Sequence, residues 1–314
     1  MKGVFECDRA SARLPRSGSE DQRGSIAILA LWGVALIFML IAPVAFATRG
    51  ELQVARNALA ASRARLAAEA GTQLGLLRLL RRHDAAAAAF DGTPEAWQQG
   101  STKVAIAIAD EAGKIDINVA PLELLAGIFE AVGTPHEAAE LIACNILERR
   151  GDSVAGCPEP DAPHGGRRFA VPEELAQLPG IDDRLYDRVA DYVTVATGAS
   201  AIDPRVAPRA VLMAIPGATD GLVDAFLESR AMWRDFGAAD ASLIPSAAAA
   251  FVMASPGRDF TIAATATTSD GARHRAELQV RLTGRANQPY QVVAWRTPPA
   301  DRGIAAAAKP RRTP

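Results

Sequence analysis

The 314-residue sequence is poor in aromatic residues, cysteine and histidine, and it has almost no net charge. Aromatic residues make up 5% of the chain, beside three cysteines and four histidines. The cysteines and histidines show no zinc-ligand spacing, and three cysteines are too few for a disulfide-dense scaffold. A formal net charge of −2 provides no overall attraction to nucleic acid or to an anionic membrane. Nucleic-acid binding would therefore need a local patch.

The sequence also lacks the motifs of nucleophilic catalysis. It contains no Gly-x-Ser-x-Gly and no phosphate loop, and its histidines are far apart: His83, His136, His164 and His274. We therefore expect that the protein is not an enzyme.

The most informative feature present is a long uncharged run near the N-terminus. From Gly24 to Thr48, 25 consecutive residues carry no charge. As a helix this run would measure roughly 37 Å, enough to cross a hydrocarbon core of about 30 Å. A secretory signal peptide has a shorter apolar stretch, followed by a cleavage site of small residues. The sequence therefore predicts a transmembrane helix over residues 25–48, and a helical pattern continues over 49–83.

The junction before this run carries a family resemblance. Charged residues occur throughout residues 1–23, and Gly24 then stands directly against the apolar segment. This arrangement resembles the processing site of type IV pilins and of the pseudopilins of the type II secretion pathway. The resemblance implies a leader of residues 1–24 that a prepilin peptidase removes, and a methylated N-terminus at Ser25.

One position departs from most members of that family. They carry a glutamate at the fifth mature position, where this sequence has Leu29. A carboxylate in hydrocarbon is costly unless it is paired. The K-type minor pseudopilin usually lacks this glutamate, so Leu29 favours that member. The similarity extends over residues 114–125, 169–181 and 201–215, although the usual asparagines of the last segment are replaced around Asp203.

The rest of the chain predicts an α+β fold. Alternating apolar residues indicate strands at Val104–Ile108 and Ile115–Val119 around a hairpin turn at Glu111–Gly113. Two more strands surround Asp270-Gly271, and another follows over residues 289–297. We expect the long N-terminal helix on a pilin-like antiparallel sheet, built from residues 49–119 and 256–296. The composition of residues 297–314 is typical of a disordered tail.

Between these strands, residues 120–255 predict an inserted all-α domain. Its segments 121–150, 171–195 and 207–233 each contain a helix, a turn with glycine and another helix. These units are similar to the helix-hairpin-helix of DNA-binding proteins. Acidic residues follow the turns, however, as at Asp182 and Asp183, where they would cap the next helix and repel phosphate. Packing or a protein interface is therefore favoured over DNA binding.

The family resemblance also implies sites and partners. Members of the family can bind calcium in the loop between helical units, where this sequence has Glu148, Asp152, Glu159 and Asp161; four carboxylates and loop carbonyls could supply the ligands. A solvated loop without metal is the alternative. Cys144 and Cys157 would pair in an oxidising periplasm or remain free thiols. The implied partners are the I- and J-type minor pseudopilins, the prepilin peptidase and the inner membrane, with no nucleic acid and the large domain in the periplasm.

The sequence thus predicts a K-type minor pseudopilin at the tip of the periplasmic pseudopilus, supporting protein export across the outer membrane. A membrane-anchored DNA-uptake protein with helix-hairpin-helix units is one alternative. A minor type IV pilin is another, and it is closer to the pseudopilin prediction.

Overall fold

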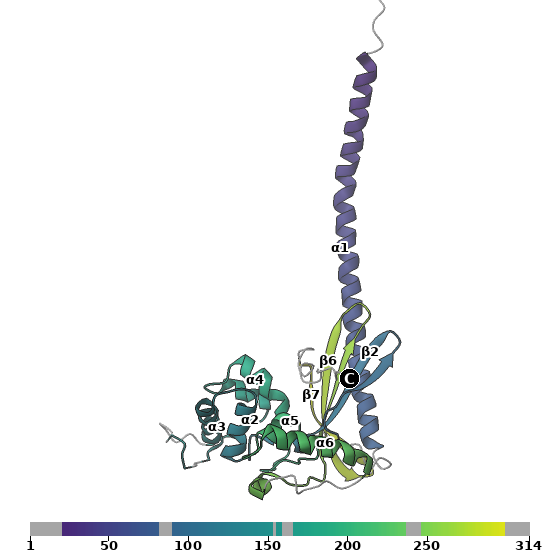
Figure 1. Cartoon of the computed structure of the whole chain (residues 1–314). Coiled ribbons are helices and arrows are strands. Elements are labelled where there is room, and N and C mark those ends of the chain that lie inside the picture. Colours follow the sequence, from purple (N-terminus) through teal and green to yellow (C-terminus); the bar gives the residue numbers. More distant parts are fainter. Residues whose placement is uncertain (1–20, 82–89, 153–154, 159–165, 237–245, 299–314) are drawn as a thin grey trace, which may run out of the picture. The chain divides into compact units, whose positions relative to one another are not determined.

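The computed structural model describes residues 21–81, 90–152, 155–158, 166–236 and 246–298 (Figure 1). The chain divides into two compact units, residues 1–59 and 60–314. The predicted leader, apart from its last four residues, lies outside the described residues, as does most of the predicted C-terminal tail.

Helix α1 (Asp21–Leu80) is a single helix of 60 residues. It confirms the predicted helical continuation beyond the apolar run and ends three residues earlier than expected. Among the described residues, no helix combines the length and apolar character needed to cross a membrane. Because the side chains at positions 25 and 42–48 of the predicted span are not described, the membrane segment stays a prediction.

The second unit contains a five-stranded antiparallel sheet in the order β1-β2-β5-β6-β7. Its strands are β1 (Glu95–Gln99), β2 (Thr102–Asp110), β5 (Asp259–Thr267), β6 (Arg273–Arg285) and β7 (Gln288–Arg296). The predicted strands on either side of Asp270-Gly271 are confirmed, and so is the last one. The mixed fold of helices and an antiparallel sheet is therefore as expected.

One face of this sheet is covered by the final turns of α1. The sheet core consists of small and large apolar residues of α1 packed on β2, β5 and β6, among them Ala68, Leu79, Ile106 and Ile262. Two glycines allow the close approach: a Cβ at Gly71 would lie 2.8 Å from the Ala264 Cβ, and one at Gly75 only 2.5 Å from the Ile262 Cγ2. The Ala- and Gly-rich face of α1 thus brings the helix backbone down onto the strands.

The predicted hairpin at Glu111–Gly113 is wrong. Those residues form the 3-10 helix η2, and β2 pairs instead with β1 and β5. The chain then leaves the sheet, and β3 (Ile115–Asp116) pairs in parallel with β4 (Val193–Thr194). Alternation alone could not distinguish a second strand of a hairpin from a short strand that pairs with a segment almost 80 residues away.

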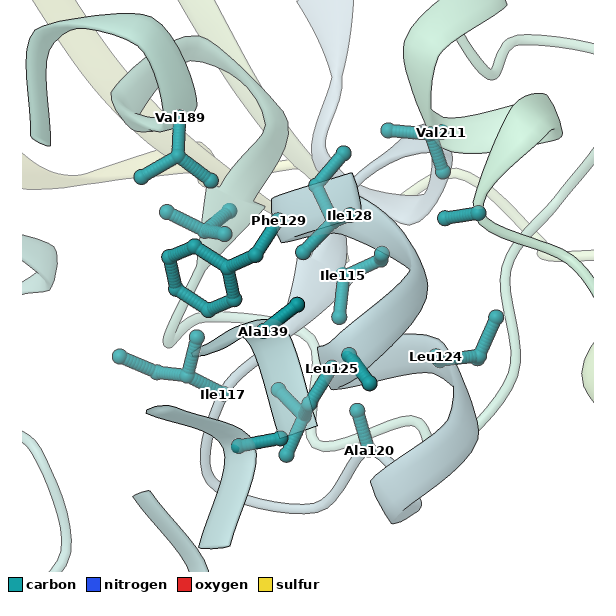
Figure 2. Packing of buried hydrophobic residues seen from close by; sticks show 14 of the residues in the cluster. Ile115, Ile117, Ala120, Leu124, Leu125, Ile128, Phe129, Ala139, Val189 and Val211 are labelled. Atoms are coloured by element: carbon teal, nitrogen blue, oxygen red, sulfur yellow. The ribbon is translucent and has the colours of Figure 1, made fainter. Parts of the chain in front are cut away.

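The helices that follow share a second hydrophobic core, the helical core. They are α2 (Leu122–Ala131), α3 (His136–Arg150), α4 (Asp183–Val189), α5 (Arg209–Met213) and α6 (Asp220–Phe236), with 3-10 helices η3 (Pro172–Gln177), η4 (Ala190–Tyr192) and η6 (Ser246–Phe251). Figure 2 shows Ile115, Phe129, Ala139 and Val189 turned toward one another within this core. The expectation that residues 120–255 are wholly helical is corrected by β4, a short strand within this region that pairs with β3.

The helical units have the turns that the sequence predicts. Gly133 between α2 and α3, Gly180 before α4 and Gly217 between α5 and α6 all have positive φ angles, between 80° and 92°. A residue with a Cβ is strained in this region of backbone conformation, so glycine lets each helix end and the chain reverse. In the helical segment 171–195, the element before the turn is the 3-10 helix η3 rather than an α-helix.

Candidate functional site

The N-terminal part of α1 exposes large apolar side chains all around the helix. Between Ile26 and Ile41 these side chains are 53–75% exposed: Ile26, Ile28, Leu29, Leu31, Trp32, Val34, Leu36, Ile37, Phe38, Met39, Leu40 and Ile41. Residues that follow one another along a helix point in all directions, so no side of this segment is polar. Gly24 and Ser25 lie on the helix backbone, but their side-chain surroundings are not described.

A stripe of leucines is exposed further along α1. Leu52, Leu59 and Leu66 follow at intervals of seven residues and Leu77 comes eleven later, and these side chains are 42–65% exposed. Intervals of seven and eleven residues return to nearly the same side of an α-helix. In residues 60–80 this side differs from the one that carries Ala64, Ala68 and Gly75 and packs on the sheet. We call these four leucines the leucine stripe.

A buried ion pair lies where the chain leaves the sheet. Glu111 is only 2% exposed, and its Oε1 is 2.6 Å from the Nζ of Lys114. Burial by itself would raise the pKa of Glu111, but the charge of Lys114 and hydrogen bonds from Lys114, Thr194 and Thr261 outweigh it. The pKa of Glu111 is therefore lowered, and the pair is charged. Through Thr194 and Thr261 the carboxylate connects η2 to β4 and to β5.

Two further buried carboxylates tie neighbouring segments together. Asp116 on β3 accepts hydrogen bonds from the backbone N–H groups of Thr197 and Gly198, at 3.0 and 2.7 Å. Asp203 accepts from the Ser255 N–H at 2.9 Å and from Arg205 at 2.6 Å, while its own N–H donates to the Ala112 carbonyl at 2.7 Å. Asp116 thus satisfies backbone N–H groups just after β4, and Asp203 satisfies one shortly before β5. Both acids therefore have a structural role.

A cavity of about 1130 Å³ lies against the sheet face that α1 does not cover. Its wall on the sheet consists largely of alanine and threonine, and Tyr186 and Tyr192 line its helical side. Four of the charged side chains that line the cavity form two pairs: Lys114 with Glu111, and Arg275 with Glu277 at 2.6 Å. Within each pair the opposite charges neutralise each other, so these four side chains do not single out an ionic ligand.

The structure joins Cys144 of α3 to Cys157 by a disulfide, with 5.5 Å between their Cα atoms. Arg150, at the end of α3, donates to the carbonyls of Ile117 and Ala120 at 3.0 and 2.8 Å and so ties this helix to the segment between β3 and α2. Its neighbour Arg149 pairs with Glu174 at 2.9 Å.

The predicted calcium ligands are only partly described. Asp152 pairs with Arg150 at 2.5 Å, and Glu148 also has an interaction partner. Glu159 and Asp161 lie outside the described residues. Among the residues that are described, no group of three or more His, Cys, Asp or Glu side chains is arranged to hold a metal ion. Calcium binding stays a prediction.

Polar side chains at two turns of the helix-hairpin-helix-like units occupy backbone N–H groups at the start of the next helix, and one of these side chains is an acid. Asp182 is the N-cap of α4, and its Oδ1 accepts the Leu185 N–H at 2.7 Å. At the next unit, Thr219 Oγ1 accepts the Leu222 N–H at 3.4 Å before α6. The predicted capping by Asp182 is confirmed. Because this carboxylate occupies a donor at the start of the helix, the geometry offers no reason to favour DNA binding.

Sequence reasoning missed Glu111 and Asp116 as structural residues. The sequence pattern places Glu111 in a hairpin turn and Asp116 on the polar side of a strand. A signal was present, because Glu111 and Lys114 carry opposite charges three residues apart between two apolar runs. Their burial depends on β4 and β5, which lie about 80 and 150 residues further along the chain.

Comparison with known proteins gives a similarity at the level of structure. No family model matches the sequence, and no curated protein matches it. A solved structure, described as the crystal structure of the GspK-GspI-GspJ complex from the type 2 secretion system of enterotoxigenic Escherichia coli, contains a chain with a TM-score of 0.49 and 14% identity. The match covers 80% of the present chain and 99% of that chain.

Proposed function

We propose that this protein is a K-type minor pseudopilin of a type II secretion system, with a mechanical rather than a catalytic role. The observation that carries the proposal is α1. A single helix of 60 residues exposes apolar side chains on every side at its beginning and packs an Ala- and Gly-rich face on an antiparallel sheet at its end. The beginning of such a helix is suited to a lipid or protein environment, and its end is suited to packing within a soluble domain.

In this proposal, residues 25–48 hold the subunit in the inner membrane after cleavage behind Gly24, and the sheet and helices lie in the periplasm. The exposed apolar surface from Ile26 to Ile41 supports this placement, because it would be costly to hydrate.

The leucine stripe supports assembly with other subunits. Exposed leucines at heptad spacing are typical of a helix that packs against a second helix. We propose that the stripe contacts the helices of the I- and J-type minor pseudopilins once the subunit leaves the bilayer. Leu29, with no carboxylate to pair, and the large helical region both favour a terminal position at the tip.

The first test is the N-terminal mass of the protein isolated from membranes that contain the prepilin peptidase. The wild-type chain should begin at Ser25, with or without a methyl group, and the Gly24→Ala chain should remain uncleaved. Gly33→Ala is the matched control inside the same helix, because nothing lies within 4 Å of the new Cβ, and this chain should be cleaved like the wild type. An intact Met1 start in all three chains would remove the pseudopilin proposal.

The second test is complex formation. The full chain in detergent, mixed with the I- and J-type pseudopilins of the same system, should form a complex of defined mass in size-exclusion chromatography with light scattering. The absence of any complex at micromolar concentrations would contradict the proposed partners, whatever the outcome of the cleavage experiment.

A further inference from the structure

The cavity beside the sheet contains a buried amide group that lacks a partner. Gln279 alternates along β6 with the core residues Leu278 and Val280, so its side chain faces the cavity rather than α1. Gln279 is 6% exposed, and its side-chain amide makes no hydrogen bond with any residue that the structure describes. Buried polar groups are as a rule hydrogen-bonded. The amide therefore indicates that the cavity holds a ligand with hydrogen-bonding groups of its own.

Elsewhere in the molecule a side-chain amide of the same kind holds a peptide backbone. The Asn118 side chain accepts the Phe169 N–H at 2.8 Å and donates to the Phe169 carbonyl at 3.0 Å. Glutamine carries the same donors and acceptor on a stem that is one carbon longer. The backbone of a peptide segment is therefore a ligand that complements Gln279.

The wall around Gln279 suits a segment with small side chains. On β2 and β5 the wall consists of short side chains, among them Ala105, Ala107, Ala263 and Thr265. Because these side chains are short, a peptide can lie close to the sheet. Tyr186 and Tyr192 line the opposite, helical side.

The charges that line the cavity differ between its two ends. The register aligns Lys103 of β2 with Arg273 of β6 across β5, and these two basic residues lie at one end. Asp110 and Glu111 lie at the other end of β2. Asp191 is close to them, because its charge acts on the lysine that Glu111 pairs with. The cavity thus has a basic end and an acidic end.

We propose that the C-terminal segment of this chain, residues 299–314, binds in this cavity. The segment follows directly on the cavity wall, since Arg296 at the end of β7 lines the cavity and is aligned with Glu277 of β6. β7 runs antiparallel to β6, so the chain leaves β7 in the direction of the basic end. Binding of the segment does not depend on the proposed function.

The composition of the segment matches the cavity along this path. Residues 301–303 contain an aspartate and a glycine, which favour a turn. A reversal there lays residues 304–308, one isoleucine and four alanines, along the alanine and threonine wall. Lys309, Arg311 and Arg312 then arrive at the acidic end. Such a segment has too little apolar surface to fold by itself, and the cavity supplies a surface for it.

The length of the segment permits this path. The register places Arg296 level with Glu277, so Gln279 is two residues away along β6, about 7 Å. Residues 299–306 can span up to about 26 Å when extended, which is enough for a reversal and a return to Gln279. The covalent tether also raises the effective concentration of the segment at the cavity to the order of millimolar.

Disulfide trapping in the full chain tests the position of the segment. Ala107→Cys is placed on the cavity wall together with Cys7→Ser, and single cysteines replace the alanines at 305–308 in turn. With a mild oxidant, at least one of them should bridge to Ala107→Cys at least tenfold faster than to Val292→Cys. Val292 is 51% exposed and is aligned with the core residue Val280, so it lies on the other face of the sheet. Equal rates, or bridges only between two copies of the chain, would overturn the proposal.

The role of the amide is tested in the same assay with Gln279→Leu. This variant keeps the size of the side chain but removes its donors and its acceptor, and it should slow bridging to Ala107→Cys at least fivefold. The control is Gln291→Leu on the exposed part of β7, which should change the rate less than twofold. Circular dichroism melts check that both variants fold. An unchanged rate with folded Gln279→Leu would show that this amide does not hold the segment, whereas the cleavage and complex-formation experiments test the proposed function separately.

Discussion

Glu111 shows how one buried carboxylate can hold several segments. It is paired with Lys114 and bonded to residues of β4 and β5, so its removal leaves the lysine buried without a counter-charge. Breaking a buried pair by removing one partner costs about 3–5 kcal/mol. Glu111→Gln should therefore lower the free energy of unfolding by about that amount in urea titrations. The control is Glu69→Gln, which removes the partly exposed partner of the exposed Arg65 and should change stability by less than about 1 kcal/mol.

The same pair predicts acid sensitivity. Because the pKa of Glu111 is lower in the folded protein than its ordinary value of 4.5, its stabilising effect is complete above that pH. The effect is lost as the pH falls through the folded pKa, where the unfolded chain binds the proton more readily. The difference in stability between wild type and Glu111→Gln should therefore shrink below pH 4.5. A constant difference down to about pH 2 would contradict this account.

His136 should titrate above its ordinary value. Its Nδ1 is 2.5 Å from Glu130, and its Nε2 is 3.5 Å from Glu140. The hydrogen bond with Glu130 and the charges of Glu140 and Glu130 raise the pKa of His136 above 6.5. Its contribution to stability is therefore present below pH 6.5 and lost as the pH rises through the folded pKa. NMR titration should give a lower pKa in Glu130→Gln, and a smaller change in Glu137→Gln.

At the scale of elements, the packing of α1 depends on the absence of side chains. Gly75→Ala adds a methyl group 2.5 Å from the Ile262 Cγ2, so the helix must shift from the sheet. Overpacking of this kind costs roughly 1–3 kcal/mol, against a gain of up to about 1 kcal/mol in helix propensity. Thermal unfolding should show a lower Tm for Gly75→Ala. Gly50→Ala, where nothing lies within 4 Å, should leave the Tm unchanged or raise it.

The disulfide closes the segment that follows α3. Cys144 and Cys157 are 13 residues apart, and a cross-link over a loop of this size stabilises by about 3 kcal/mol in the chain-entropy account. Cys144→Ser with Cys157→Ser should lower the urea midpoint, and reductant should shift the wild type toward the double variant. If reductant leaves the wild-type midpoint unchanged, the bridge does not contribute to stability.

At the scale of the whole molecule, both hydrophobic cores lie in residues 60–314. Those residues of 1–59 whose side chains the structure describes supply none of the core members, so we expect that removal of 1–59 does not unfold the remainder. A fragment of residues 60–314 should melt within about 3 °C of the full chain by circular dichroism. If the fragment of residues 60–314 shows no cooperative unfolding transition, the first unit is needed for folding.

Much of the architecture was predictable because it depends on local patterns. The uncharged run, the alternation of β5, β6 and β7 and the glycine turns of the helical units all occupy short stretches of sequence, and local periodicity reports them directly. The N-cap at Asp182 belongs to the same group, since a cap needs only the residue and the next turn of helix.

The features that could not be predicted depend on partners far apart in the chain. β1 is short and polar, and it is a strand only because β2 and Arg78 lie beside it. Ile115 and Ile117 have the alternation of half a hairpin, but β3 pairs with β4. No rule of local spacing distinguishes these outcomes, because the free energy that decides between them comes from burial in a core assembled from distant segments.

The sequence alone therefore determined that this chain has a charged N-terminal segment, a long uncharged run, a sheet and helical units, since each is a property of neighbouring residues. Only the tertiary structure decided which strands pair, that Glu111 and Lys114 are buried together, and that α1 packs on β2, β5 and β6. The reason is physical: composition and periodicity act within a few turns of chain, whereas packing and desolvation depend on every segment that meets in space.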